Sequence, residues 1–345
     1  MSTSFWIHPI GSALGDIKRD VAQMVANNGE VREGFLARTG FETLYQASPE
    51  QTGLDLGRTA LADVDLDWLR TNVDALIYVT STGNRAAPGN GHLLHGELAL
   101  APHTLVLDLN DACTGFIRSV ILANSLLASG AAETVLVVIS DTYSKLYADS
   151  NLRVSPLFSD GASAMILTAN SVSIPGITHA ARNWEVLSTT VISDGKRADE
   201  LTVARGSEAF PFGELEMNGA GVFNFVVKHV KPSVAEAVSH AHLESADINR
   251  WYIHQGSRAV VDAVSKALSL DPDTQFVSSQ YGNVVGSAIP FQLLAESHES
   301  AETESTESTE STGQNLFLLA FGVGLTLAGI VIKESSIREN ASVHD

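Results

Sequence analysis

A cysteine, a histidine and an asparagine occupy positions where catalytic side chains commonly occur. Cys113 is the only cysteine of the chain and lies in the run LDLNDACTGFIRSV. A predicted buried strand leads into Cys113 and a predicted buried helix follows it. This places the thiol at a strand-to-helix turn, where free N–H groups and the helix dipole favour a thiolate. The sequence therefore indicates a nucleophilic cysteine, although an inert buried thiol is the alternative.

The candidate partners of this thiol also follow strands or turns. His254 comes directly after WYI and precedes Gln-Gly-Ser, and Asn283 lies in the turn QYGNVVGSAIP before a predicted helix. A Cys-His-Asn set can carry an acyl group, but such residues meet in space and their separation along the chain does not test the idea. Read locally, His254 is a structural histidine and Asn283 is a turn residue.

Composition limits the classes of partner. The 345 residues are 44% hydrophobic and 18% charged, which is sufficient for a large core. The formal net charge of −19 argues against nucleic acid or an anionic membrane as the main partner, because phosphates would be repelled. One cysteine excludes an intramolecular disulfide, in keeping with a reducing cytoplasm. We find no metal-ligand pattern, and FGVGLTLAG lacks the glycine spacing of a dinucleotide-binding loop.

Two segments bear on membrane association. The N-terminus MSTSFWIHPIGSALG lacks a basic region followed by an apolar region, so we expect no signal peptide. The apolar run from Leu316 to Ile332 is slightly short for a membrane span and contains three glycines. We interpret this run as two buried strands around a glycine turn, with a membrane helix as the alternative.

Strands and helices alternate in the first half of the chain. Short apolar runs rich in β-branched residues predict buried strands at Ala75–Thr80, Thr104–Leu109, Thr134–Ser140 and Ala162–Thr168. The segment Gly115–Ser129 is apolar almost all round and is closed by Gly130, which predicts a buried helix with a glycine stop.

The second half repeats this order. We expect strands at Trp251–Ile253, Gln275–Ser278, Leu316–Ala320 and Leu325–Ile332, and helices at Arg258–Leu268 and Gly286–Ala295. The repeat indicates an internal duplication, with halves at residues 1–170 and 171–345, in an α/β fold whose sheets are covered by helices. The acidic, low-complexity segment 296–313, which contains three EST repeats, is expected to be a solvated insertion.

Seven motifs in order resemble the β-ketoacyl-acyl-carrier-protein synthase III branch of the thiolase superfamily, and they cover nearly the whole chain. They are ARTGF (37–41), DACTGF (111–116), LFSDGASAMIL (157–167), MNGAGVFNF (217–225), IHQGSR (253–258), YGNVVGSAIP (281–290) and FGVGLT (321–326). The resemblance implies a thiolase-like fold of two duplicated α/β halves, in a layered αβαβα arrangement. It also implies a cytoplasmic homodimer.

The resemblance assigns roles to individual residues. The family's catalytic triad falls on Cys113, His254 and Asn283, and the oxyanion donors would be the backbone N–H groups of Cys113 and Val323. Residues that would bind substrate are Arg38, Ala87, Phe158, Phe210 and Phe321. The implied substrates are acyl-coenzyme A or acyl-carrier-protein thioesters, with no cofactor.

The chain departs from the family pattern at several positions. The family's Phe-Gly-Asp-Gly is Phe158-Ser159-Asp160-Gly161 here, and His-Gln-Ala-Asn is His254-Gln255-Gly256-Ser257. Gly34 stands where relatives often have a tryptophan that stacks on coenzyme A, and Ala87 stands where they have a bulky aromatic residue at the end of the acyl pocket. These departures concern the positions that would set the length of the acyl chain and recognise its donor.

Three functions are compatible with these motifs. The first is a condensing enzyme that joins an acyl-cysteine to a malonyl thioester with release of carbon dioxide. The second passes the same acyl group to a hydroxyl or an amine, and the third is a non-enzymatic partner subunit. The intact Cys-His-Asn set argues against the third. Lys228, His229 and Lys231 either form a basic face for an acidic carrier protein or are ordinary surface charges.

Overall fold

The computed structural model describes residues 4–177, 181–204, 213–303 and 313–335. Nine of its strands form one mixed sheet in the order β11-β12-β13-β8-β1-β7-β6-β4-β5. Their bounds are β1 Ser4–Leu14, β4 Ala75–Val79, β5 Leu105–Leu109, β6 Thr134–Asp141, β7 Gly161–Thr168, β8 Arg182–Ser193, β11 Arg250–Ile253, β12 Gln314–Gly322 and β13 Thr326–Ser335. Two separate two-stranded antiparallel sheets pair β2 (Ile17–Asp20) with β3 (Thr43–Gln46), and β9 (Leu201–Ala204) with β10 (Glu214–Met217).

The β1–β8 pair divides the sheet into two similar parts. Ser4–Ile7 of β1 pairs antiparallel with Arg182–Glu185 of β8. On the β1 side the order continues through β7, β6 and β4 to β5, and on the β8 side through β13 and β12 to β11. In both parts the first two pairings beyond the junction are antiparallel and the next one is parallel.

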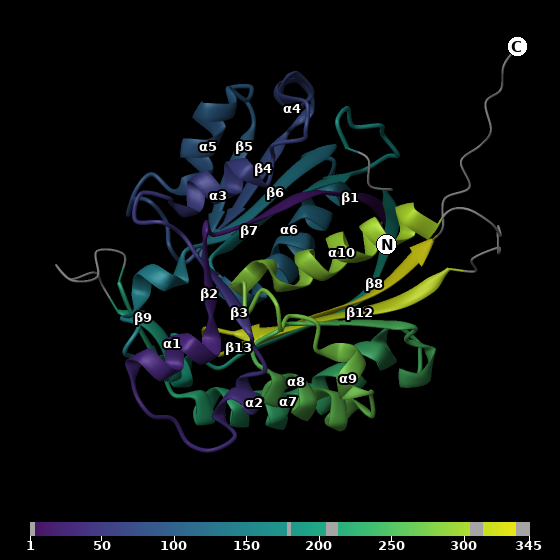
Figure 1. Cartoon of the computed structure of the whole chain (residues 1–345). Helices are drawn as coiled ribbons and strands as arrows, with labels where there is room; N and C mark the ends of the chain where they lie inside the picture. Colours follow the sequence, from purple (N-terminus) through teal and green to yellow (C-terminus); the bar gives the residue numbers. More distant parts are fainter. Residues whose placement is uncertain (1–3, 178–180, 205–212, 304–312, 336–345) are drawn as a thin grey trace, which may run out of the picture.

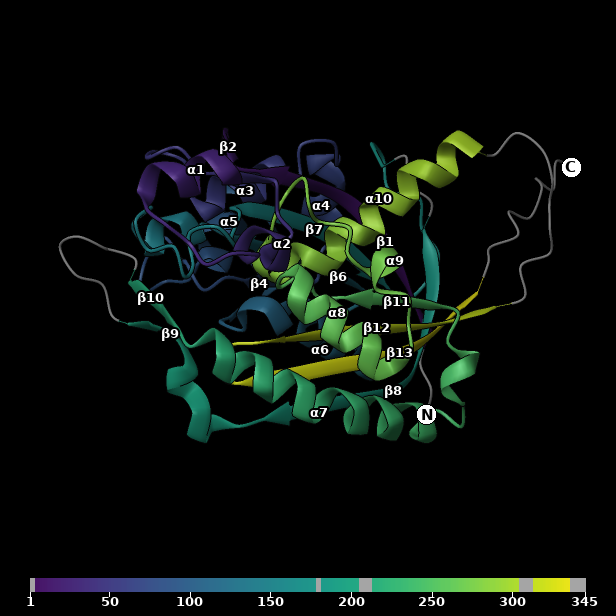
Figure 2. The same ribbon diagram turned by 60° about the horizontal axis from the view of Figure 1, so that its bottom comes forward.

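Helices separate and cover these two parts, which gives five layers (Figures 1 and 2). The helices α3 (Gly53–Thr59), α4 (Leu66–Asn72) and α5 (Asn90–Leu98) lie on the outer face of β4, β6 and β7. The helices α6 (Gly115–Ser129) and α10 (Ala288–Thr303) lie between the two parts of the sheet. The helices α7 (Gly219–His240) and α8 (Arg258–Leu268) cover β12 and β13 from the other side. The expected αβαβα layering is confirmed.

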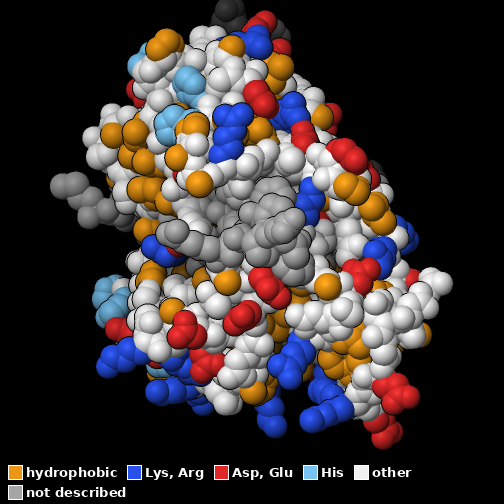
Figure 3. All heavy atoms as spheres, turned by 90° about the vertical axis from the view of Figure 1, so that its left-hand side faces the viewer, with side chains coloured by type: hydrophobic (Ala, Val, Ile, Leu, Met, Phe, Trp, Pro, Cys, Tyr) orange, Lys and Arg blue, Asp and Glu red, His pale blue; other side chains and the backbone are white. Residues whose placement is uncertain are grey.

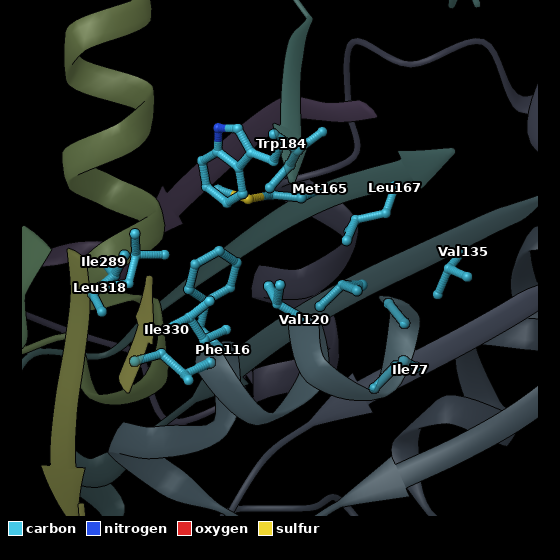
Figure 4. Close-up of a cluster of buried hydrophobic side chains, with 14 of the residues drawn as sticks. Ile77, Phe116, Val120, Val135, Met165, Leu167, Trp184, Ile289, Leu318 and Ile330 are labelled. Atoms are coloured by element: carbon cyan, nitrogen blue, oxygen red, sulfur yellow. The ribbon is translucent and has the colours of Figure 1, made fainter. Parts of the chain in front are cut away.

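The middle layer contains the largest apolar cluster. Phe116 and Val120 of α6 and Ile289 of α10 are each at most 2% exposed, and they pack between strands from both parts of the sheet (Figure 4). The strand residues labelled around them are Ile77, Val135, Met165, Leu167, Trp184, Leu318 and Ile330. Because α6 meets sheet on both sides, it must be apolar nearly all round, which explains its sequence.

The central helix also resembles a membrane span in composition. By length and apolar character, Ala112–Ser129 is the one stretch of the described residues that could cross a membrane, and 56% of it is buried inside the fold. The other apolar run, Leu316–Ile332, forms the β12–β13 hairpin around Gly322 and Gly324, so the prediction of two strands is confirmed.

Most of the elements expected from the sequence are present. The predicted helices Gly115–Ser129 and Arg258–Leu268 match α6 and α8, and α6 ends at Gly130 in the left-handed conformation. The predicted strand Gln275–Ser278 is wrong. Pro272–Gln275 forms the short helix α9, with Pro272 at its first position, and residues 276–278 belong to no strand. Two further helices, α1 (Val21–Asn28) and α2 (Phe35–Thr39), lie in the connection between β2 and β3.

The acidic segment is partly helical, which corrects the expectation that a solvated insertion begins at residue 296. Helix α10 continues to Thr303. At the start of the segment, Glu296 accepts hydrogen bonds from Tyr252 at 2.5 Å and from Arg250 at 3.0 Å, which ties α10 to β11. The EST repeats at 304–312 lie outside the described residues.

Candidate active site

Cys113 lies in a tight turn between β5 and α6. It is the middle residue of a 3₁₀ turn, Ala112–Thr114, that leads directly into α6. Gly115 makes this turn fit beneath β4, because a side-chain carbon on Gly115 would stand 2.3 Å from Cγ1 of Val79. The thiol is therefore fixed against the sheet and is 7% exposed.

His254 follows the last residue of β11, and its position is fixed by the backbone. Its N–H donates to the carbonyl of Leu319 on β12 at 2.8 Å, and its ring meets the Phe321 ring edge-on at 5.4 Å. The next residue, Gln255, is fully buried. Its amide donates to the carbonyls of Ile253 and Gln275, so it ties the end of β11 to the loop that leads towards Asn283.

Asn283 is held in a parallel bridge to Phe158. Its N–H donates to the carbonyl of Leu157 at 3.0 Å, and its carbonyl accepts from the N–H of Ser159 at 2.9 Å. Its side-chain Oδ1 accepts from the N–H of Val285 at 2.9 Å. Because that donor can pair only with oxygen, the Nδ2 group is the donor that this amide has left to offer.

These three side chains line one cavity of about 150 Å³, which is close to the size of an engineered apolar cavity that binds benzene. Most of its other lining residues are apolar, namely Leu157, Phe158, Leu201, Met217, Val222, Val260 and Phe321; Tyr143, Gly219, Gly256, Ser257 and Gly322 complete the lining. The fold thus brings together residues from β5–α6, from the end of β11 and from the turn before α10.

Burial dominates the electrostatics of the cavity. It raises the pKa of the Cys113 thiol to about 12, and the charge of Asp141 adds to this effect. Burial also lowers the pKa of His254 to about 3. At neutral pH the resting site therefore holds a thiol beside a neutral imidazole. The expectation that the helix terminus keeps a thiolate is wrong for this resting state, because desolvation of the buried sulfur outweighs the helix dipole.

The β12–β13 turn lies against the thiol. A side-chain carbon on Gly322 would stand 2.8 Å from Cβ and 3.3 Å from Sγ of Cys113, so only glycine fits there without displacement. Val323, the expected oxyanion donor, is the next residue in this turn and packs partly buried against the cluster around α7 and β12.

The expected substrate-binding residues are not all in the cavity. Phe158 and Phe321 line it and are 4% and 3% exposed. Arg38 is exposed on α2, and Ala87 is exposed in the loop after β4, and neither lines the cavity. Phe210 lies outside the described residues.

Several lining residues were not predicted from the sequence. Leu201 and Met217 come from the β9–β10 sheet, and Val222 and Val260 come from α7 and α8. Tyr143 could have been predicted from its position, because it follows β6 by two residues and Cys113 and His254 also lie just beyond strand ends. The apolar residues could not have been, because their types do not differ from those of ordinary core positions. Among the described residues, no three His, Cys, Asp or Glu side chains are grouped for a metal ion.

The five-layer fold and a cavity with cysteine, histidine and asparagine define a thiolase-fold acyltransferase. Two family models match the chain, 3-oxoacyl-[acyl-carrier-protein] synthase III over residues 107–195 and its C-terminal region over residues 238–334. The chain belongs to this family, the synthase III family of the thiolase superfamily, and is a synthase III-like condensing acyltransferase.

Individual relatives support this assignment. The chain is 28% identical to the β-ketoacyl-[acyl-carrier-protein] synthase III of Clostridium perfringens strain SM101, with 87% of this chain and 90% of that protein covered. It is also 28% identical to the synthase III of Bartonella tribocorum, with 95% and 98% covered. The crystal structure of 3-oxoacyl-(acyl carrier protein) synthase III from Pseudomonas aeruginosa PAO1 matches with a TM-score of 0.79 at 25% identity, covering 96% and 99%.

Proposed function

We propose that Cys113 accepts an acyl group from a thioester and that His254 and Asn283 then assist its condensation with a malonyl thioester. The observation that carries this proposal is the convergence of these three side chains on one otherwise mostly apolar cavity. Thiol chemistry with thioesters needs no cofactor, because the sulfur itself forms the covalent intermediate.

In the first half-reaction, Sγ of Cys113 bonds to the acyl carbon while the carbon–sulfur bond of the donor breaks. The proton of the thiol must leave, and the departing thiolate of the donor must gain one. Neutral His254 is the ionisable base among the described lining residues and can pass this proton on. The backbone N–H groups of Cys113 and Val323 would hold the oxyanion, at about 3 kcal/mol for one such donor.

In the second half-reaction, the malonyl thioester loses carbon dioxide and forms an enolate. Its oxygen would accept hydrogen bonds from Nε2–H of His254 and from Nδ2–H of Asn283. Both groups are neutral donors, so they stabilise negative charge without placing another anion in the cavity. The enolate carbon then attacks the acyl carbon, and the sulfur of Cys113 leaves and regains its proton.

The acyl donor is proposed to be acyl-coenzyme A or an acyl-carrier protein, in fatty acid or polyketide synthesis. Phe158 and Phe321 would contact the acyl group within the cavity, and Arg38 would meet the donor outside it. Lys and Arg side chains gather along the lower edge of the face in Figure 3, towards the end where α7 lies in Figure 1. Exposed Lys228 and Lys231 of α7 are candidates for docking an acidic carrier protein.

The protein is further proposed to be a cytoplasmic homodimer. β5 is an edge strand of the nine-stranded sheet, and its Leu105 is 43% exposed. An unpaired edge with exposed apolar side chains is suited to pairing with a second copy across a two-fold axis. In such a dimer the exposed Ala87 of one copy would approach the acyl pocket of the other.

Two duplicated halves, residues 1–170 and 171–345, are proposed as the organisation of the chain. The support is the matching strand order on either side of the β1–β8 junction. The helices α6 and α10 also occupy equivalent places, since each precedes an inner strand of its own part of the sheet.

Mass spectrometry of the intact protein tests the reaction. Incubation with acyl thioesters should add one acyl mass to the wild-type protein and none to Cys113→Ser, because serine lacks a comparable thiolate. Addition of malonyl-carrier protein should then remove the acyl mass and release a 3-oxoacyl product. Release only on addition of a hydroxyl or amine acceptor would replace condensation with ester or amide formation. Full acylation of the serine variant would exclude Cys113 as the nucleophile.

A further inference from the structure

The phenol of Tyr143 lies in the cavity lining and takes no part in the condensation chemistry. Tyr143 lies two residues beyond β6 and is 1% exposed, and its ring packs against that of Phe158 at 5.0 Å. It lines the same cavity as Cys113, His254 and Asn283.

The hydroxyl oxygen of Tyr143 has no hydrogen-bond partner within the described structure. Ser81 is near enough to the phenol to influence its pKa, but Ser81 donates its own hydroxyl hydrogen to Oδ1 of Asn110 at 2.9 Å and forms no hydrogen bond of normal geometry with Tyr143. Native proteins rarely leave a buried hydroxyl unpaired, since the lost hydration is not replaced. An orphan hydroxyl in the wall of a substrate cavity therefore indicates a partner that arrives with the substrate.

The phenol keeps its proton at neutral pH. Burial raises the pKa of Tyr143 well above its ordinary value, and the charge of Asp141 acts in the same direction. Tyr143 thus offers a neutral O–H that can donate to an oxygen or accept from a hydroxyl. Most of the side chains that share the cavity with Tyr143 are apolar.

We propose that Tyr143 is a specificity-determining residue whose hydroxyl pairs with an oxygen substituent on the acyl chain, so that the enzyme prefers hydroxyacyl or oxoacyl groups over plain alkyl chains. This rests on the proposed function, because it concerns the acyl group that Cys113 carries. A site built to hydrogen-bond a substituent discriminates strongly against the analogue that lacks it, because its own polar group is then left unpaired. The cavity volume favours a short acyl group.

The test compares donors that differ by one oxygen. Rates of Cys113 acylation are measured by intact-protein mass spectrometry with butyryl-, 3-hydroxybutyryl-, hexanoyl- and 5-hydroxyhexanoyl-coenzyme A. The wild-type protein should favour a hydroxylated donor over its alkyl partner by about tenfold or more. Tyr143→Phe should lose this preference and acylate with the alkyl donor at the wild-type rate or faster.

Tyr147→Phe is the matched control. Tyr147 is also buried, but its hydroxyl donates to the carbonyl of Phe158 at 3.3 Å and it does not line the cavity. This variant should lower the melting temperature and leave the donor preference unchanged. Tyr143→Phe should leave the melting temperature unchanged or raise it, because it removes an unpaired hydroxyl.

The outcomes separate the two proposals. Equal wild-type rates for both members of each donor pair would overturn the role of Tyr143, as would a Tyr143→Phe variant that slows all donors alike. A marked loss of melting temperature in that variant would also overturn it, since the hydroxyl would then have an internal partner. Absence of acylation by every donor would overturn the proposed function and this inference with it.

Discussion

Gly322 stands directly against the sulfur-bearing side chain of Cys113. A carbon atom added to Gly322 would lie 2.8 Å from Cβ and 3.3 Å from Sγ of Cys113, distances that real side chains do not tolerate without movement. The end of β12 and the start of α6 are therefore in contact at the nucleophile. These two elements are more than 200 residues apart in the sequence. The position of the Cys113 thiol, and therefore its reaction rate, depends on how closely they approach each other.

The first prediction follows from this contact. Gly322→Ala should slow acylation of Cys113 by about a hundredfold, because displacement of a nucleophile by about 1 Å has an effect of that size. Gly96→Ala is the control, since nothing lies within 4 Å of the position that its new methyl group would occupy. Stopped-flow or mass-spectrometric acylation rates decide the matter. A Gly322→Ala protein as fast as the control would contradict the tight fit.

The second prediction concerns the charge of Asp141. This carboxylate is buried, and its charge contributes to the raised pKa of Cys113. Asp141→Asn removes the charge while keeping an oxygen for the bonds from Ser81, Thr80 and Thr82. The pKa of the thiol should fall, and iodoacetamide should label Cys113 faster at each neutral to alkaline pH. Asp111→Asn, two residues from the thiol, should change the labelling rate much less.

The same variant changes the pH dependence of stability. Burial raises the pKa of Asp141 to about 7 from its ordinary value of 3.8, so between these values the folded protein binds more protons than the unfolded chain. The contribution of Asp141 to stability is therefore lost as pH rises through this window. Relative to wild type, the free energy of unfolding of Asp141→Asn should increase from pH 3.8 to pH 7. A constant difference across these denaturant titrations would show that the carboxyl is not desolvated.

The third prediction separates the two half-reactions. Asn283→Asp keeps the Oδ1 acceptor for the Val285 N–H but replaces the amide donor with an anionic oxygen. Condensation should fall by about 10²–10³-fold, the usual effect of losing one oxyanion donor. Acylation should fall less, because the proposed oxyanion donors of that step are backbone groups. If acylation and condensation fall equally, Asn283 acts before the enolate forms.

The fourth prediction tests the dimer. Leu105→Asp places a charge on the exposed edge strand β5, where the side chain is 43% exposed in the single chain. Light scattering should report a dimer for wild type and a shift to monomer for this variant, because an unpaired charge would be buried in the interface. Leu66→Asp, at the start of α4 and 42% exposed, is the matched control and should remain dimeric. A monomeric wild-type protein at micromolar concentration would contradict the assembly.

Local sequence was sufficient wherever one segment's own pattern fixes its structure. Gly115–Ser129 is apolar almost all round and is followed by Gly130, and it forms α6 over the predicted residues. Leu316–Ile332 contains glycines that favour a turn over a membrane helix, and it forms the β12–β13 hairpin. The predicted strand at Gln275–Ser278 was wrong because Pro272 starts a short helix that runs to Gln275. The residues after this helix pair with no strand.

Some features of the site could likewise be predicted from the sequence, and others depend on the tertiary structure. The sequence by itself determined the reactive residue types and, through seven ordered motifs, the family to which Cys113, His254 and Asn283 correspond. Only the tertiary structure decided which other side chains share their cavity, that Tyr143 stands there without a partner, and that Arg38 lies outside. It also decided the state of the thiol, because desolvation depends on what surrounds the sulfur in space, whereas the helix terminus can be read from neighbouring residues.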